Sequence, residues 1–208
     1  MPLIHDPDLI EVKIYKYTVE PLDGKDAKAA YYRASDILLA LGVRTWVAAG
    51  TALGLYRDGG FIPHDTDIDV ETTQIDRFQD IKIAFVQNGY KIAREMFYCG
   101  IPMQIAFVHP DDNIIFDIYF YLWMIKDGVN ANFNEHGILT IPNHFLEKMP
   151  LRHDVVSAFY PAPIEEYLTH RYGNWKEKTT EKGNWHEQAA NLITEVKRED
   201  ISPNPVME

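Results

Sequence analysis

Cysteine and basic residues are scarce in this sequence, and each shortage excludes a class of protein. Cys99 is the single cysteine among 208 residues, so neither an intramolecular disulfide nor a cysteine-based zinc site can form. A lone cysteine is compatible with a reducing cytosol. Lys and Arg number 20 against 31 Asp and Glu, and the formal net charge is −11. Because proteins bind long nucleic acids through clustered basic residues, this balance argues against such a partner.

Long apolar runs are also missing. No uncharged run approaches the roughly 18 residues that a membrane-spanning helix needs. Residues Met1–Val12 lack the basic and apolar regions of a signal peptide. We therefore expect no membrane span and a cytoplasmic location. Hydrophobic residues nevertheless make up 46% of the chain, which is enough for a substantial core in one domain.

The most informative stretch is an acidic one in which aspartates alternate with uncharged residues. Asp65, Asp67 and Asp69 are separated by Thr66 and Ile68. Side chains of a strand alternate between its two faces, so Asp67 and Asp69 would project together while Ile68 points into the core. Asp65 is expected on the same side, although a place at the start of the strand also suits a turn or cap residue.

Two carboxylates held side by side need a proton or a cation between them. At a separation of about 6 Å and an effective dielectric of about 20, their repulsion is about 3 kcal/mol. Mg²⁺ accepts carboxylate oxygens and leaves positions open for phosphate oxygens, whereas an acidic pair of this kind does not suit zinc. Isolated D-x-D pairs are mostly solvated loop residues, but this pair lies in an apolar strand pattern. The pattern therefore favours a Mg²⁺ site, with Mn²⁺ as a substitute, and phosphoryl or nucleotidyl chemistry.

Three further features near the aspartates suit a phosphate or nucleotide ligand. Gly50 and Thr51 open a predicted helix, whose free N–H groups can bind an anion; the alternative is an ordinary turn with a threonine cap. Next to the carboxylates, we favour phosphate binding. Arg57 either pairs with a carboxylate or contacts a donor phosphate. His64 either forms a wall of the nucleotide pocket or is merely a polar neighbour.

A third carboxylate, Asp117, interrupts the apolar run Ile114–Ile125. An unpaired charge there would cost several kcal/mol, so either a buried arginine pairs with it or it reaches the metal site. A strand adjacent to that of Asp67 and Asp69 would bring the three carboxylates together. We favour a functional role for Asp117, as a metal ligand or as the base that accepts a proton from the hydroxyl group to which a phosphoryl group is transferred.

Residues Gly50–Asp69, GTALGLYRDGGFIPHDTDID, resemble the LicD and fukutin-related family of phosphotransferases. Weaker similarity continues in Ile114–Phe120 and in Tyr160–Trp175, so the resemblance covers roughly residues 25–180. His64 stands where the family usually has an aromatic residue, and Thr66 interrupts the acidic run of the family pattern.

The resemblance implies a nucleotidyltransferase-type fold and a specific reaction. A phospho-alcohol such as phosphocholine or ribitol phosphate would pass, with Mg²⁺, from a CDP-linked donor to a hydroxyl of a glycan or glycolipid acceptor. It also implies that the third carboxylate of the site is Asp117. Two alternatives remain: a nucleotidyltransferase that moves NMP from NTP to a small molecule or protein, and a catalytically silent nucleotide-binding or regulatory module.

The periodicity predicts a domain of the α/β (α+β) class, with a mixed or largely antiparallel sheet, flanking helices and a C-terminal helical extension. Helices are expected over Asp26–Leu41, Gln74–Asn88, Pro163–Tyr172 and Trp185–Lys197, and strands over Val43–Ala49, Tyr90–Phe97, Met103–Val108 and Ile114–Tyr121. Asn130–Thr140 is expected to be an irregular polar segment. We divide the chain into an arm or strand at 1–24, a catalytic domain at 25–180, and a helix and tail at 181–208.

Overall fold

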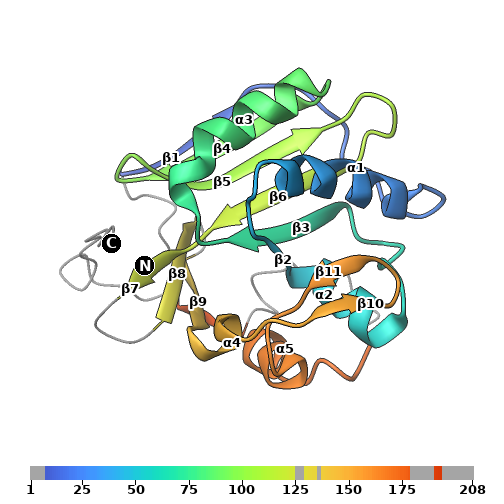
Figure 1. Cartoon of the computed structure of the whole chain (residues 1–208), viewed down its shortest axis with the longest axis vertical. Helices are drawn as coiled ribbons and strands as arrows, with labels where there is room; N and C mark the ends of the chain where they lie inside the picture. The colour runs from blue at the N-terminus through green and yellow to red at the C-terminus, as the bar shows by residue number, and fades with distance from the viewer. Residues whose placement is uncertain (1–7, 125–128, 135–136, 179–189, 194–208) are drawn as a thin grey trace.

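A six-stranded sheet forms the centre of the fold (Figure 1). The computed structural model describes residues 8–124, 129–134, 137–178 and 190–193. In spatial order the strands are β1 (Leu9–Lys13), β4 (Lys91–Tyr98), β5 (Ile101–Val108), β6 (Ile115–Phe120), β3 (Asp67–Thr72) and β2 (Trp46–Val47). The pairing of β3 with β6 is parallel, and the other pairings in this sheet are antiparallel. This is the mixed sheet that the sequence predicted.

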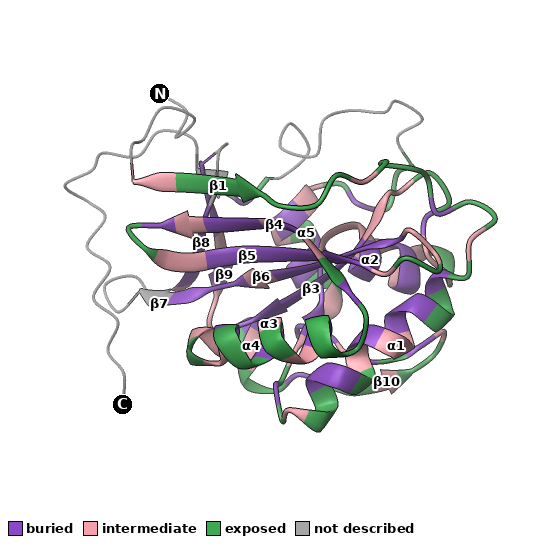
Figure 2. Cartoon of the chain, turned by 90° about the horizontal axis from the view of Figure 1, so that it is seen from above, coloured by how far each residue is buried: buried purple, intermediate pink, exposed green. Residues whose placement is uncertain are grey.

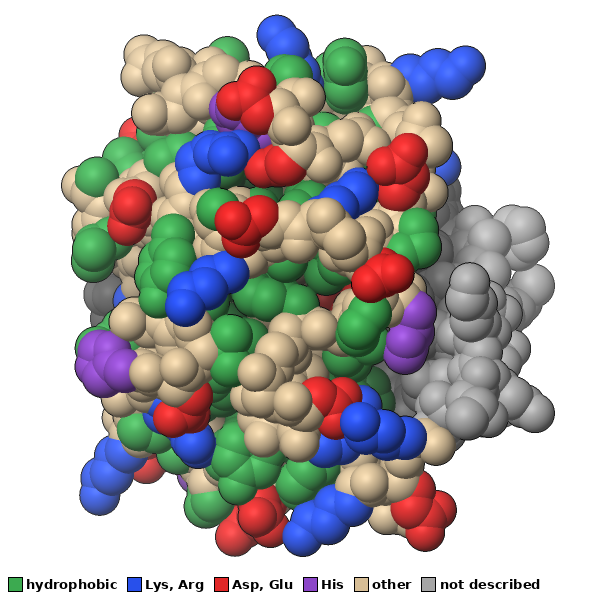
Figure 3. Space-filling model, turned by 90° about the vertical axis from the view of Figure 1, so that its right-hand side faces the viewer, with side chains coloured by type: hydrophobic (Ala, Val, Ile, Leu, Met, Phe, Trp, Pro, Cys, Tyr) green, Lys and Arg blue, Asp and Glu red, His purple; other side chains and the backbone are tan. Residues whose placement is uncertain are grey.

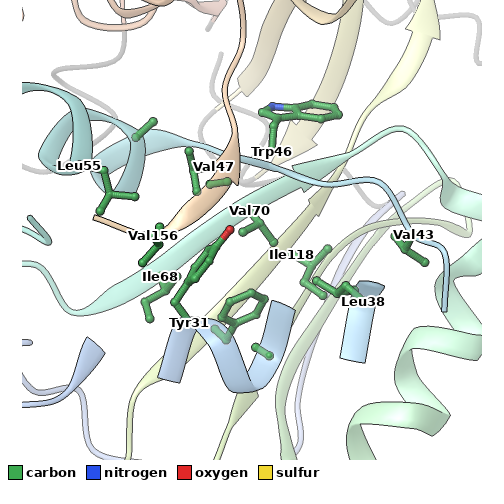
Figure 4. Packing of buried hydrophobic residues seen from close by; sticks show 14 of the residues in the cluster. Tyr31, Leu38, Val43, Trp46, Val47, Leu55, Ile68, Val70, Ile118 and Val156 are labelled. Atoms are coloured by element: carbon green, nitrogen blue, oxygen red, sulfur yellow. The ribbon is translucent and has the colours of Figure 1, made fainter. Parts of the chain in front are cut away.

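Two helices, α1 (Ala27–Ala40) and α3 (Phe78–Gln87), cover one face of this sheet (Figures 1 and 2). Alternate residues of β3, Ile68 and Val70, are buried against this side, and Figure 4 shows them in the core beside Tyr31 of α1. Because strand residues alternate between faces, this burial turns the intervening acidic residues of β3 to the opposite face.

The side chain of one residue and the backbone of another fix the two ends of α1. The Asp26 side chain accepts a hydrogen bond from the Ala29 N–H at 2.9 Å and so caps the start of α1. After α1, Gly42 takes a left-handed conformation with φ of +68°, which favours glycine.

The remaining helical elements are short. They are α2 (Ala49–Leu53) with a π-helical turn (Gly54–Asp58), a short 3₁₀ turn (Ile75–Arg77), α4 (His144–Glu147) and α5 (Ile164–Tyr172). A second sheet has the order β12 (Leu192–Ile193), β9 (Gly137–Pro142), β8 (Val129–Asn134) and β7 (Leu122–Met124). A hairpin joins β10 (Leu151–His153) to β11 (Ser157–Phe159).

The expected helices before residue 180 and most expected strands are confirmed. The strand predicted over Val43–Ala49 is shorter, because Ala49 already begins α2. The irregular segment predicted over Asn130–Thr140 is wrong: it contains parts of β8 and β9, which pair as a hairpin. Asparagines have low strand propensity, but the buried Asn132 amide donates to the carbonyls of Met103 and Phe120 at 2.7 and 2.9 Å, which offsets its burial.

The predicted helix over Trp185–Lys197 is wrong in its described part, because Leu192–Ile193 form β12 and pair with β9. The backbone of these two residues pairs with β9, about 50 residues earlier in the chain, and a local sequence pattern does not predict such a distant partner. The rest of that segment lies outside the described residues. The division of the chain at residues 24 and 180 stays a prediction.

Surface charge is mixed on the side drawn in Figure 3. Acidic and basic side chains are interspersed there with apolar ones, and the described part of that side has no continuous basic area (Figure 3). None of the described helices has the length and apolar character needed to cross a membrane.

Candidate active site

Three aspartates from two neighbouring strands lie together on the sheet face opposite α1 and α3. Asp67 and Asp69 belong to β3, and Asp117 belongs to β6. The parallel register places Asp69 directly opposite Asp117. One carboxylate oxygen from each residue lies within 4.8 Å of the other two. We call these three residues the acidic trio.

The acidic trio is withdrawn from solvent. Asp117 is 0% exposed and Asp69 is 6% exposed, while Asp67 is half-buried. Burial raises the pKa of Asp69 well above its usual range, and the neighbouring negative charges of Asp67, Asp65 and Asp117 raise it further. Burial, followed by the charges of Asp117 and Asp65, does the same to the pKa of Asp67. Together the three carboxylates favour a proton or a cation among them.

The donor set fits a hard divalent cation. It consists of carboxylate oxygens, the ligands that Mg²⁺ prefers, and oxygens on opposite sides of a Mg²⁺ ion are about 4 Å apart. The observed spacing of at most 4.8 Å needs only small side-chain movements to reach that value. Asp67, Asp69 and Asp117 are therefore the residues that would hold a divalent cation.

Asp117 has an arginine partner and also lies beside Asp67 and Asp69. Arg94 of β4 donates from Nη2 to Asp117 Oδ2 at 2.9 Å, and Gln104 of β5 donates from Nε2 to Oδ1 at 2.7 Å. The arginine partner, which is only half-buried, and the place beside Asp67 and Asp69 thus occur together. The negative charge of Asp117 raises the pKa of Arg94, so the arginine stays charged.

Sequence reasoning missed both partners of Asp117. Arg94 and Gln104 lie on strands that it predicted correctly, but each looks like an ordinary polar residue of an alternating pattern. Both partners could have been predicted from two facts taken together: a carboxylate in an apolar run needs a basic partner, and β4, β5 and β6 are consecutive antiparallel strands.

Thr51 of α2 contacts the backbone of Asp69, and Gly50 contacts the side chain of Asp65. The Thr51 Oγ1 accepts a hydrogen bond from the Asp69 N–H at 2.9 Å, and Thr51 itself is buried. Gly50 lies so close to Asp65 that a Cβ at this position would collide with the Asp65 carboxylate. These contacts fix β3 against α2; phosphate binding by the two residues stays a prediction.

Asp65 lies beside the acidic trio, on the side expected. Burial raises the pKa of its carboxyl, which also accepts a hydrogen bond from the Thr66 N–H at 3.0 Å. The Asp65 and Asp67 carboxyl groups are placed so that one can donate a hydrogen bond to the other when it is protonated. Asp65 therefore helps to orient Asp67.

Arg57 and His64 occupy less direct positions. Arg57 forms an ion pair with Asp58 at 2.9 Å and donates to the Trp175 carbonyl at 3.2 Å, so it ties the π-helical turn to the segment after α5. This is the structural pairing of the two alternatives considered for Arg57. His64 is exposed in the turn before β3. The roles expected for both in donor binding stay predictions.

A buried polar cluster extends the site toward α5. Glu71 follows Asp69 on the same face of β3, and its carboxylate accepts from Trp46 Nε1 at 2.8 Å and from Tyr121 OH at 3.1 Å. Arg171 of α5 lies 3.3 Å from the same carboxylate and is buried. Burial raises the pKa of the neighbouring Tyr172, and the negative charge of Asp69 raises it further. The end of α5 therefore contacts Glu71, two residues after Asp69 on β3, although sequence reasoning missed Glu71 and Arg171.

Comparison with known proteins identifies a family match. A sequence model described as the LicD/FKTN/FKRP nucleotidyltransferase domain matches residues 42–163, which is more than half of the chain and includes the acidic trio. The resemblance noted from residues Gly50–Asp69 is thereby confirmed.

Two relatives illustrate the range of the similarity. Human ribitol-5-phosphate transferase FKTN is 31% identical over 97 residues, which are 47% of this chain but 21% of that protein. An uncharacterized protein of Rickettsia prowazekii is 32% identical over 113 residues, covering 50% of this chain and 41% of that one. The similarity thus spans about a fifth of the length of the named transferase.

Among solved structures, the lincosamide antibiotic adenylyltransferase LnuA with bound lincomycin is 19% identical with a TM-score of 0.49. The match covers 70% of this chain and 86% of that one. The family assignment follows from the sequence match over residues 42–163 alone.

Proposed function

This chain belongs to the LicD/FKTN/FKRP nucleotidyltransferase family, and on that premise we propose that it is a Mg²⁺-dependent phosphotransferase. The reaction moves a phospho-alcohol, of the phosphocholine or ribitol-phosphate kind, from a CDP-linked donor to a hydroxyl of a glycan or glycolipid. The convergence of Asp67, Asp69 and Asp117 within 4.8 Å is the observation that carries this proposal.

The bonds that change define the products. The acceptor oxygen forms a bond to the phosphorus that carries the alcohol, and the bond from that phosphorus to the CMP oxygen breaks. CMP leaves, and the acceptor hydroxyl loses its proton. Such transfers depend mainly on positioning and on neutralising charge around the phosphoryl group.

Side chains of this chain supply the positioning. Asp67 and Asp69 would hold the cation, and Mg²⁺ or Mn²⁺ bound there would supply positive charge to the phosphate oxygens. Asp117 either completes the ligand set or accepts the proton of the acceptor hydroxyl. In both versions Arg94 and Gln104 fix the Asp117 carboxylate from the side of β4 and β5.

The electrostatics of Asp117 suit a group that must stay ionised beside two other carboxylates. Arg94 places a positive charge 2.9 Å from Asp117 Oδ2, and Nη2–H···O⁻ bonds of this kind are stronger than neutral ones. Of the acidic trio, Asp117 is therefore the carboxylate with a fixed counter-charge, while the pKa values of Asp67 and Asp69 are raised. Cation binding relieves mainly these two.

Nucleotidyl transfer from an NTP to a small molecule or protein would use the same carboxylates, so the products decide between the two reactions. Release of CMP from a CDP-linked donor supports phospho-alcohol transfer, whereas release of pyrophosphate from an NTP supports nucleotidyl transfer. A silent binding module is less consistent with an intact acidic trio whose carboxylates converge.

The test measures CMP release from CDP-ribitol and CDP-choline in the presence of a methyl glycoside that offers the acceptor hydroxyl, with Mg²⁺ and with EDTA. We expect Mg²⁺-dependent release by the unmodified protein and a loss of at least about a hundredfold in the Asp67→Asn and Asp69→Asn variants. Asp111→Asn is the matched control, because this carboxylate is 76% exposed in the turn between β5 and β6. Full turnover by Asp67→Asn and Asp69→Asn would contradict the proposal.

A further inference from the structure

The segment that connects β1 to α1 is tied to the sheet at both of its ends. We call residues 14–24 the strap. At one end the Ile14 N–H donates to the Ala93 carbonyl of β4 at 2.9 Å. At the other end the Leu22 N–H donates to the Asp65 carbonyl at 2.7 Å, beside the acidic trio. Figure 2 shows the strap running on from the end of β1. It precedes the residues matched by the family model, which begin at residue 42.

Tyr17 of the strap packs on the sheet face that carries the acidic trio. Its ring lies against a small cluster of buried residues on three strands, Ala93, Ala106, Val108 and Ile115. Ala106 pairs directly with Asp117, and Ile115 pairs with Asp67. Tyr17 is therefore next to the acidic trio on the side of β5 and β4.

Electrostatics agree with this placement of the ring. Burial raises the pKa of Tyr17, and the charges of Arg94, Asp117 and Asp67 all act on its hydroxyl. The hydroxyl thus remains protonated at neutral pH and is available as a hydrogen-bond donor near Asp117.

The acidic trio has two sides along the sheet. Thr51 and Gly50 of α2 lie on the side of β2, where we place the donor phosphates. The attacking and leaving oxygens of a phosphoryl transfer lie roughly in line on opposite sides of phosphorus. The acceptor must then approach from the side of β5 and β4, where Tyr17 is located.

We propose that Tyr17 is a specificity-determining residue that forms the acceptor wall of the site. Its ring contacts the C–H face of the sugar that carries the attacking hydroxyl, and its hydroxyl donates to an oxygen of that sugar. Tyrosine suits this task because it offers an apolar ring and a polar tip with little conformational entropy to lose. This inference rests on the proposed transfer to a glycan hydroxyl.

The experiment measures CMP release from CDP-ribitol and CDP-choline while the methyl glycosides of galactose, N-acetylgalactosamine and glucose are added one at a time. The variants are Tyr17→Ala, Tyr17→Leu and Tyr17→Phe. Tyr15→Ala is the matched control, because Tyr15 belongs to the same strap but is 43% exposed.

We expect at least one glycoside to raise CMP release by the unmodified protein. For that glycoside, Tyr17→Ala should raise the acceptor KM about tenfold or more, while the donor KM changes less than about threefold. Tyr17→Leu keeps apolar packing on the strand residues and should show the same rise, even if Tyr17→Ala folds poorly. Tyr17→Phe should raise the acceptor KM by a smaller factor, and Tyr15→Ala should match the unmodified protein.

Three outcomes would overturn the inference. If the unmodified protein releases no CMP from either donor with Mg²⁺, the proposed function fails and the inference fails with it. If CMP is released but no glycoside raises its rate, a sugar on the Tyr17 side is contradicted while the donor chemistry stands. If a glycoside acts but its KM in Tyr17→Leu stays within about threefold of the unmodified value, the role of Tyr17 alone is refuted.

Discussion

Replacing Asp69 by asparagine should make the metal-free protein more stable while it removes the response to Mg²⁺. Asp69 is 6% exposed, and its carboxylate lies within 4.8 Å of those of Asp67 and Asp117. At that separation and an effective dielectric of about 20, two like charges repel by about 3 kcal/mol. Part of this repulsion is already avoided by protonation, because the pKa values of Asp67 and Asp69 are raised. We therefore expect a gain of about 1 to 3 kcal/mol at neutral pH.

The pH dependence of the metal-free protein has a definite sign. A group whose pKa is raised in the folded state contributes stability below its unfolded pKa, about 3.9 for aspartate, and that stability is lost as pH rises through the folded pKa. Asp67 and Asp69 should therefore destabilise the metal-free protein as pH rises from about 4 through their raised values. Mg²⁺ should restore stability at neutral pH. Asp69→Asn should weaken the pH effect and remove the response to Mg²⁺.

The assay is thermal unfolding at pH 5 and pH 7.5, with EDTA or with Mg²⁺. A change of 1 kcal/mol shifts the Tm of a chain of this size by about 2–4 °C, so Asp69→Asn should melt about 2–12 °C higher in EDTA. Asp111→Asn should not change the Tm in either condition. A lower Tm for Asp69→Asn in EDTA, or a Tm of the unmodified protein that does not respond to Mg²⁺, would refute this reasoning.

Three other substitutions test the surroundings of the acidic trio. Arg94→Met leaves the buried Asp117 without its counter-charge, so we expect a loss of about 3–5 kcal/mol in urea unfolding together with a fall in CMP release; unchanged unfolding would contradict the ion pair. Thr51→Val removes the acceptor of the Asp69 N–H and should cost about 1–3 kcal/mol by the same measurement, whereas Thr51→Ser should cost less. Gly50→Ala places a Cβ against the Asp65 carboxylate, so the metal affinity measured by calorimetry should fall. Gly60→Ala is the control, because a Cβ there meets open space. Equal metal affinities of the two variants would argue against the close approach of Gly50 to Asp65.

The acidic trio could be predicted from the sequence because each of its members is a charged residue within an otherwise apolar strand pattern. Asp67 and Asp69 alternate with buried residues, and Asp117 interrupts an apolar run, so a shared ligand explains all three. The parallel pairing of β3 with β6 then brings them together. Here, local pattern and long-range pairing agree.

The groups around the acidic trio could not be predicted in the same way. Arg94 lies 23 residues from Asp117 and reaches it only through the order of β4, β5 and β6. Tyr17 reaches the same face because the strap is tied to β4 and to Asp65, which no periodicity reveals. Arg57 pairs with Asp58, its immediate neighbour, and a single sequence does not distinguish that pairing from a contact with a ligand.

The central claim is that Asp67, Asp69 and Asp117 bind one divalent ion together. Anomalous X-ray scattering from crystals soaked in Mn²⁺ and CDP tests it most directly, because manganese is located independently of the surrounding atoms. The account predicts one strong manganese peak coordinated by a carboxylate oxygen of each of the three residues, and loss of that peak in Asp69→Asn crystals. A peak bound elsewhere, or the same peak without Asp117 among its ligands, would contradict it.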